Sequence, residues 1–411
     1  MTSLCSIGCR TAVYLLAIAV ATAALATPAA PSLTLDEAIR VALAGHPALR
    51  AAAQEVDGAR AAVQGAKALP SPELVVTPAG TVDDSQLSLF QSLEVNGQSS
   101  ARVAAARARV SSAEAQWEAA RQEIVYGVRT AFYEALAAQQ ERDVAAQAVE
   151  LLQKLHEAAQ ESFEAGDVPQ SHVIRTRVEL ARAGQELRLA EGEAAARRAA
   201  LNAAMGRDPT TPFTLQGEWP RPETLPDAET ARATAERQRP ELAAMQAETQ
   251  AREAETRLAR AARRPDVVLE AKRARLTRDG GSIGVGVTLP FVDWGRRRAE
   301  VRQAEAAYQA QQARLEQQRN QVALEVEEAL ARLQAAAEVA RSYENGVLAD
   351  AGRLAEMTQT GYQEGALTYL EVIDAQRALV EARRGAIRAR AAYASARAAL
   401  DRAIASPIAA R

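Results

Sequence analysis

The chain is poor in the residues that build disulfide frameworks and catalytic centres. Its 411 residues include only two cysteines, Cys5 and Cys9, both near the N-terminus. A disulfide framework, a thiolate metal site and a cysteine nucleophile are therefore excluded from the body of the chain. The three histidines, His46, His156 and His172, are scattered and lack the spacing of a metal site.

An excess of charge of one sign is also lacking. The formal net charge of −3 gives no electrostatic reason to expect a nucleic-acid partner. No Gly-rich phosphate loop follows a strand-like run, and no serine is grouped with a histidine and a carboxylate in a known motif. We therefore expect no enzyme: no catalytic residue, no cofactor and no resident metal.

What the chain has in abundance is alanine, at 97 residues, while aromatic residues make up only 4%. Alanine is the strongest helix former and the smallest side chain that can fill a core. A composition this rich in Ala, Arg, Glu, Gln and Leu predicts long helices that pack closely.

The N-terminus has the layout of a secretory signal peptide over residues 1–26. Arg10 precedes an uncharged run, residues 11–26, and Ala24-Leu25-Ala26 is a candidate cleavage site. The alternative is a membrane anchor, but the run is short for a span and ends before Pro28. No later run is apolar enough for a transmembrane helix, and an exported chain cleaved here would hold no cysteine.

The remaining sequence contains one unit written twice. Residues of the first copy recur 193 positions later, then 198, then 199. The matched residues are Pro47 with Pro240 and Pro72 with Pro265; Gly97 with Gly295, Val103 with Val301 and Ile124 with Val322; and Gly166 with Gly365. We assign residues 27–206 to the first copy, 207–226 to a Pro-rich linker and 227–411 to the second copy.

Each copy has the same predicted plan, which makes the fold mainly α with a small β part. A helix of about 33 residues is followed by two short strands, a very long helix and a helix of about 35 residues. The predicted helices are 35–69, 98–164 and 170–205 in the first copy, and 228–264, 296–364 and 369–404 in the second. The long helix should span roughly 100 Å and the others roughly 50 Å. Two shorter helices placed end to end would thus flank one long helix in a duplicated coiled-coil tunnel.

The strand-like runs carry a membrane argument. Ile283, Val285, Val287 and Leu289 alternate with small or polar residues, so we expect them to face lipid. A spanning barrel strand needs about 9–11 residues, which the second hairpin meets and the first barely reaches. Four strands cannot close a barrel alone. Either several chains pool their strands into an oligomeric transmembrane β-barrel, or the hairpins pack inside a soluble domain.

The motifs around these strands are similar to those of a known family. Leu289-Pro290-Phe291-Val292-Asp293-Trp294-Gly295-Arg296-Arg297, lying between a strand and a very long helix, resembles the signature of the TolC-type outer-membrane efflux proteins. Thr34-Leu35-Asp36-Glu37-Ala38 resembles the family's N-terminal opening, and Tyr362-Gln-Glu-Gly365 its periplasmic tip. The stretch from Leu93 to Val103 is similar to the branch that exports cobalt, zinc and cadmium.

The resemblance implies a homotrimer in the outer membrane of a Gram-negative bacterium. Three chains would form a twelve-stranded barrel in lipid, on a helical tunnel closed at its periplasmic end. The implied partners are a periplasmic adaptor and an inner-membrane pump of the resistance-nodulation-division type. The implied activity is export of metal cations or drugs.

The resemblance also implies gate residues at the tip. Glu371 and Asp374 match carboxylates that form a constricted, acidic entrance in the family, and crowding there should raise some of their pKa values. Their first-copy counterparts are His172 and Arg175. The family often carries a carboxylate in place of His172, bonded to the tyrosine that matches Tyr362. Leu367 stands where some members use an arginine to hold the gate.

Two other classes of protein are exported and helical. A periplasmic adaptor should carry β-rich segments on both sides of one hairpin, whereas this chain has two equal helical copies. A helical coiled-coil scaffold without a channel would not need the alternating strands.

Overall fold

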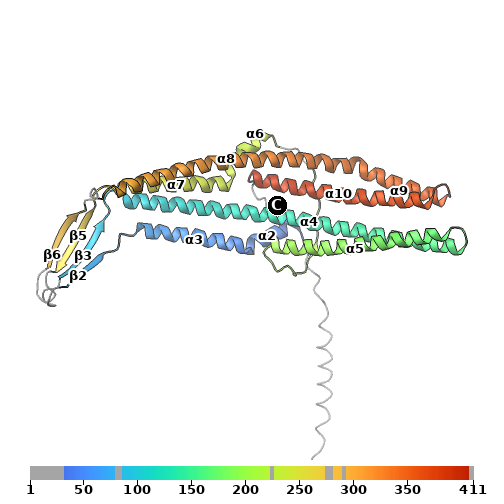
Figure 1. Ribbon diagram of the computed structural model, residues 1–411, viewed down its shortest axis with the longest axis horizontal. Helices are drawn as coiled ribbons and strands as arrows, with labels where there is room; N and C mark the ends of the chain where they lie inside the picture. The colour runs from blue at the N-terminus through green and yellow to red at the C-terminus, as the bar shows by residue number, and fades with distance from the viewer. Residues whose placement is uncertain (1–31, 79–85, 223–225, 274–280, 289–292, 407–411) are drawn as a thin grey trace, which may run out of the picture.

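The computed structural model describes residues 32–78, 86–222, 226–273, 281–288 and 293–406. The expected signal peptide and Leu289 lie outside these residues. The described chain is an elongated helical body with a sheet at one end and two helical hairpins at the other (Figure 1). The candidate functional residues fall into two groups, one at the sheet end and one at the hairpin end.

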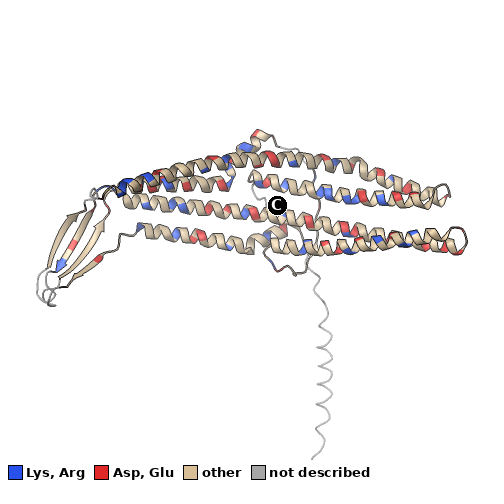
Figure 2. Cartoon of the chain, in the orientation of Figure 1, with Lys and Arg blue, Asp and Glu red and all other residues tan. Residues whose placement is uncertain are grey.

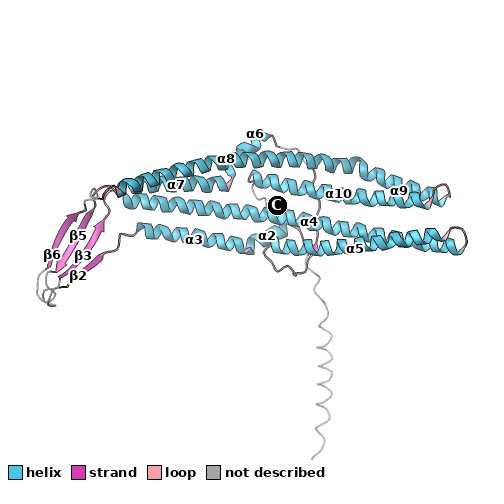
Figure 3. Ribbon diagram, in the orientation of Figure 1, coloured by secondary structure: helices cyan, strands magenta, loops and turns pink. Residues whose placement is uncertain are grey.

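The first copy contains α2 (Leu35–Gly45), α3 (Pro47–Lys67), β2 (Glu73–Thr77), β3 (Gln86–Leu93), α4 (Gln98–Glu164) and α5 (Gln170–Ala204). The second contains α6 (Ala228–Gln238), α7 (Pro240–Ala261), β5 (Val267–Arg273), β6 (Gly281–Val287), α8 (Arg296–Ser342), the π-helical turn η2 (Tyr343–Val347), α9 (Leu348–Gln363) and α10 (Tyr369–Ala403). Figure 3 shows this order of helices and strands repeated in the two halves. The duplication expected from the sequence is therefore present in the fold.

The predicted first helix of each copy is in fact two helices. The chain is extended at His46, where ψ is 128°, and at Arg239, where ψ is 118°, and a proline begins the next helix in both cases. Proline has no amide hydrogen to donate and keeps the preceding residue out of the helical region. In each copy the helix before the sheet and the last helix nevertheless lie end to end along the long helix: α3 and α5 along α4, and α7 and α10 along α8 (Figure 1). The expected end-to-end arrangement is therefore observed.

The long helices match the predicted bounds, with one exception. α4 is continuous over its 67 residues. The matching path in the second copy is interrupted by the five residues of η2 before it continues as α9. Gly97 and Gly295 precede the two long helices with φ of 81° and 91°, a left-handed conformation that glycine adopts without strain.

The two cores lie at matching positions on the long helices. Val128 and Phe132 of α4 are buried against α2 and the end of α5, while Val322 and Val326 of α8 are buried against α6 and α10. Segment 207–222 also packs on α4, where Trp219 stacks on Tyr133 with ring centroids 5.9 Å apart. Its short strand β4 (Thr214–Leu215) pairs in parallel with β1 (Ser32–Leu33). This part of the predicted linker is thus an ordered part of the body.

The sheet joins the two copies. Its strand order is β2-β3-β5-β6, and every neighbouring pair is antiparallel. The described strands contain five, eight, seven and seven residues, fewer than the 9–11 expected of a spanning strand. The longest belongs to the first hairpin, so the expected advantage of the second hairpin is not seen in the described residues. Segments 79–85, 274–280 and 289–292, which adjoin these strands, lie outside those residues.

Candidate functional sites at the two ends of the molecule

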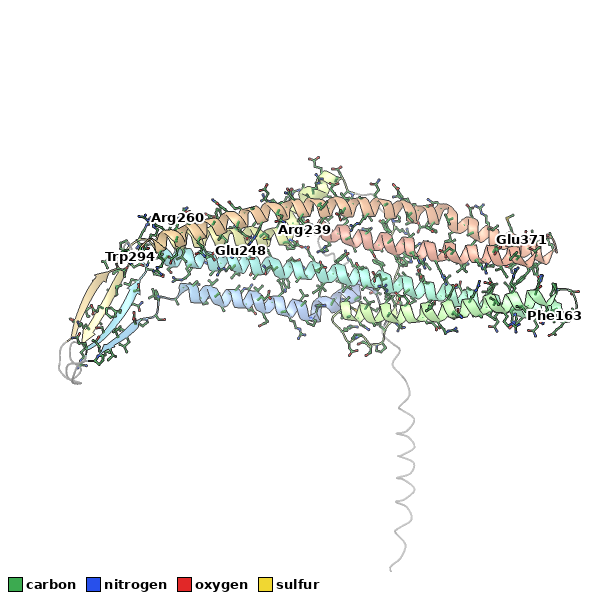
Figure 4. The ribbon with its side chains drawn as sticks, in the orientation of Figure 1. Phe163, Arg239, Glu248, Arg260, Trp294 and Glu371 are labelled. Carbon is green, nitrogen blue, oxygen red and sulfur yellow. The ribbon has the colours of Figure 1, made fainter. Side chains whose placement is uncertain are left out.

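One candidate site is the end formed by the two helical hairpins, which we call the tip. Loop 165–169 joins α4 to α5, and loop 364–368 joins α9 to α10. Gly166 and Gly365 end the preceding helices with φ of 87° and 75°, the left-handed conformation that stops a helix. Figure 4 shows Phe163 and Glu371 together at this end, far from Trp294 beside the sheet.

An aromatic cluster links the two hairpins at the tip. Tyr369 is only 5% exposed and lies at the start of α10. Its ring stacks on His172 of the first copy, with centroids 6.2 Å apart, and meets Tyr362 edge-on at 5.9 Å. The Tyr369 hydroxyl is buried and has no hydrogen-bond partner among the described residues. Burial, with smaller contributions from Tyr362 and Glu179, raises the pKa of this hydroxyl, which stays protonated.

His172 is not hydrogen-bonded to the Tyr362 hydroxyl within the described part of the chain. The Tyr369 ring meets both side chains instead. His172 contacts the face of the Tyr369 ring, and Tyr362 meets that ring edge-on. Tyr369 belongs to a stretch that resembles the family's periplasmic tip, but it was not among the candidate gate residues. Its first-copy counterpart is Gln170, so no repeated pattern marks it.

Glu371 caps the start of α10 at the tip. Its carboxylate accepts hydrogen bonds from the backbone amide of Thr368 at 2.7 Å and from the Thr368 hydroxyl at 2.8 Å. This is a capping box at the start of α10. The two bonds lower the pKa of the Glu371 carboxyl within one chain. The rise expected from the sequence concerns carboxylates brought together from three chains and stays a prediction.

Asp374 is the freer of the two carboxylates. It is exposed, and its partner is Arg377 of the same helix at 3.5 Å. Arg377 makes a closer contact of 2.5 Å with Glu179 of α5. Asp374 therefore shares its arginine and projects its charge into solvent at the tip.

A ladder of side-chain contacts continues from the tip between α5 and α10. Its three rungs are His172 with Tyr369, Glu179 with Arg377, and Glu186 with Arg384 at 2.8 Å. The α5 members are seven residues apart, which keeps them on one face of the helix. The ladder crosses from the first copy to the second, so separating the two hairpins would break all three contacts.

The other candidate gate residues lie close to this ladder. Leu367 packs over Gly361, where an added Cβ would come within 2.7 Å of the leucine side chain. Arg175 is exposed and makes no ion pair among the described residues. Within those residues, no group of three or more His, Cys, Asp or Glu side chains is placed to hold a metal ion.

The second candidate site is the apolar face of the sheet. The register places Leu74, Leu89, Ala271 and Ile283 in one row across the four strands. The exposed apolar side chains all fall on this face and comprise Leu74, Val76, Leu89, Leu269, Ile283, Val285 and Val287. Ile283 is 86% exposed and Val285 71%. Glu270 and Lys272 point to the opposite face with Ser282, Gly284 and Gly286, as the alternation predicts.

Within the described residues, no helix combines the length and the apolar character needed to cross a bilayer. An exposed apolar patch of this extent on the sheet marks a contact with lipid or with another protein.

Comparison with known proteins relates the chain to one family. A sequence model described as "Outer membrane efflux protein" matches residues 38–207 and 232–406, which correspond to the two copies. The cobalt-zinc-cadmium resistance protein CzcC of Cupriavidus metallidurans is 29% identical over 360 residues, covering 85% of each chain.

Two solved structures have a similar fold. The outer-membrane channel OprN is 21% identical with a TM-score of 0.77, and the match covers 90% of this chain and 89% of OprN. The outer membrane protein VceC of Vibrio cholerae is also 21% identical, with a TM-score of 0.74 over 90% of this chain and 95% of VceC.

Proposed function

The chain belongs to the outer membrane efflux protein family, and on this premise we propose that three copies pool their sheets into one closed barrel that continues into a helical tunnel. The protein is then the outer-membrane channel of an efflux system, a conduit rather than an enzyme. The sheet carries this proposal. Its outer strands, β2 and β6, each have one edge without a partner among the described residues, and one face is apolar.

An open apolar sheet cannot persist alone in lipid. Every backbone amide and carbonyl in the hydrocarbon region needs a partner, so the edges must pair. Four strands are too few to close on themselves, whereas twelve from three chains are enough. Pairing β6 of one chain with β2 of the next satisfies both edges and turns the apolar face toward lipid.

Arginine substitutions on the two faces of β6 test this arrangement. Val285→Arg or Val287→Arg should lower the yield of assembled oligomer in the outer membrane, at about 2–4 kcal/mol each near the bilayer midplane. Gly284→Arg and Gly286→Arg are matched controls on the same strand, and they should be tolerated better because they face the aqueous lumen. Equal loss of oligomer from both faces would exclude the barrel.

At the tip we propose an acidic, closed entrance. Asp374 is the residue best placed for this role, since its carboxylate is exposed while Glu371 is held by Thr368. A ring of such carboxylates should favour cations and repel anions. In planar bilayers the native channel should show a small, cation-selective conductance that polyvalent cations block from the tip side. Asp374→Asn should weaken the block, and an unchanged block would place the acidic entrance elsewhere.

For the cargo and partners we propose divalent metal cations, a periplasmic adaptor and an inner-membrane pump. CzcC is named for resistance to cobalt, zinc and cadmium, and it supports this assignment. Expression of the chain with its cognate pump in a strain that lacks its own metal efflux channel should raise tolerance to these ions. A rise in tolerance to organic drugs alone would point to a different cargo.

A further inference from the structure

Trp294 occupies an unusual position where the sheet meets the helices. Its side chain is 98% exposed, and its φ of 55° lies in the left-handed region that non-glycine residues seldom adopt. Neither packing inside this chain nor backbone preference explains a large aromatic residue here. Figure 4 shows Trp294 at the end of the helical body, beside the sheet.

Four exposed arginines lie at the same junction and form, with Trp294, what we call the arginine collar. They are Arg263 and Arg264 after α7, and Arg296 and Arg298 in the first turn of α8. Positive charge at the start of a helix is electrostatically unfavourable, because the helix dipole is positive there. Figure 2 shows basic residues gathered where α8 leaves the sheet.

Few of these arginines form an ion pair with a carboxylate of the described residues. Arg263, Arg264 and Arg298 form no ion pair within the described part of the chain. Arg296 has an exposed contact with Glu300 at 3.6 Å and a weaker electrostatic interaction with Asp293. Asp293 is held mainly by hydrogen bonds from the backbone amides of Gly295 and Arg297, at 3.0 and 2.7 Å.

The first copy is built differently at the matching positions. Asn96 stands in place of Trp294, and its side-chain amide donates to the Pro265 carbonyl and to Asp266. Gln98 and Ser100 stand in place of Arg296 and Arg298, and Gln98 donates to Asp266 at 2.7 Å. The first-copy junction is therefore tied to the protein itself, whereas the second-copy junction presents its side chains outward.

We propose that the arginine collar binds the anionic headgroups of phospholipids in the leaflet that borders the helical tunnel. The inference rests on the proposed function, which places the apolar sheet in the bilayer. Val287, 58% exposed on the apolar face, is only seven residues before Trp294, so the collar lies next to the lipid-facing surface. Tryptophan concentrates at the level of lipid headgroups, and clustered arginines are attracted to anionic lipid.

Lipid-specific fluorescence quenching tests the proposal. The purified full chain is reconstituted in vesicles of phosphatidylcholine that contain, at equal mole fraction, either brominated phosphatidylglycerol or brominated phosphatidylcholine. The chain has three tryptophans, so subtraction of the Trp294→Phe variant isolates the signal of Trp294. Brominated phosphatidylglycerol should quench this signal at least about threefold more effectively, and raised salt should reduce the preference.

Matched variants separate local charge from total charge. Arg263→Gln/Arg264→Gln/Arg298→Gln should abolish the preference for the anionic lipid. Arg314→Gln/Arg319→Gln/Arg341→Gln removes the same charge from exposed positions of α8 farther from the sheet and should keep the preference. Equal loss in both variants would overturn the proposal. The salt dependence of the native protein shows, without any substitution, whether the preference is electrostatic.

Flotation with vesicles of phosphatidylcholine alone separates this inference from the proposed function. A chain that does not float with the vesicles contradicts the channel, and with it the lipid contact. A chain that floats as an oligomer, yet is quenched equally by both brominated lipids, contradicts the arginine collar alone.

Discussion

In the first copy α4 runs without interruption for 67 residues, whereas the second copy follows the same path through α8, η2 and α9. The second path is one residue longer, and η2 lies where the extra residue is absorbed. A single inserted residue in a helix is commonly accommodated as a π-helical turn, which leaves the residues on both sides in register. Gly385 of α10 leaves room for this turn because it has no side chain. An added Cβ there would lie 2.5 Å from the Tyr343 hydroxyl. The tip of the second copy is thus joined to its long helix by a less regular element than the tip of the first.

The helix junctions near the middle of the molecule differ in a second way. His46 joins α2 to α3, and its side chain accepts a hydrogen bond from the amide of Ala48, at 3.2 Å. Arg239, at the matching position, is 3% exposed. It pairs with Glu241 at 3.1 Å and Glu325 at 2.8 Å, and donates to the Ala403 carbonyl. The same backbone break is therefore held by a buried charge in one copy and by a local cap in the other.

The largest expected effect comes from single-residue deletions at matching places in the long helices. Deleting Ala148 from α4 should rotate everything beyond it by about 100° and prevent assembly of the tip. Deleting Gly346 from η2 should convert the turn to α-helix and change the melting temperature by only a few degrees. The yield and melting temperature of the two deletion variants are compared with those of the native protein. Equal damage from both deletions would mean that η2 does not absorb the extra residue.

The next effect is expected at the helix junctions. Arg239→Ala leaves two carboxylates and a carbonyl without their shared donor and should cost about 3 kcal/mol of unfolding free energy. His46→Ala removes one exposed cap and should cost less than about 1 kcal/mol. Chemical denaturation of the detergent-solubilised protein compares the two. Costs of similar size would show that the buried arginine contributes no more than the cap.

The smallest expected effect is a pH dependence confined to the second-copy tip. The folded-state pKa of Glu371 is lowered, so its capping box contributes stability above the unfolded value of about 4.5 and loses it as the pH falls through the folded value. Hydrogen exchange in the first turn of α10 should therefore accelerate in acid, after correction for the intrinsic rate. Glu371→Gln should remove this dependence. The first turn of α5, which has no side-chain cap, is the internal control.

Much of the helical architecture follows from the sequence, because long helices and repeats depend on local propensity and spacing. The bounds of α4 were predicted to the residue, and those of α5 and α10 to within one. The change of repeat distance from 198 to 199 is a further sequence signal, because it places one extra residue in the stretch that contains η2. The splits at His46 and Arg239 were missed although Pro47 and Pro240 marked both, since an apolar pattern continues across them.

The tip was harder to predict than the body. Glu371 and Asp374 were expected to act alike, since they share a helix face. Their roles differ because Thr368, at the helix start, captures only the first of them. The ladder of His172, Glu179 and Glu186 depends on contacts between copies about 200 residues apart in the chain, which local patterns do not encode. Its only trace in the sequence is the seven-residue spacing of the α5 members.

Cysteine crosslinking between the outer strands tests the pooled barrel most directly. Both natural cysteines lie within the expected signal peptide, so introduced thiols would report without interference. One cysteine is placed in β2, at Leu74 or Val76, and another in β6, at Ile283, Val285 or Val287, in the same chain. A three-chain ring predicts that at least one pair gives covalent dimers and trimers and nothing larger, in outer membranes. Products limited to single chains for every pair, or a ladder that extends beyond trimers, would contradict the closed three-chain barrel.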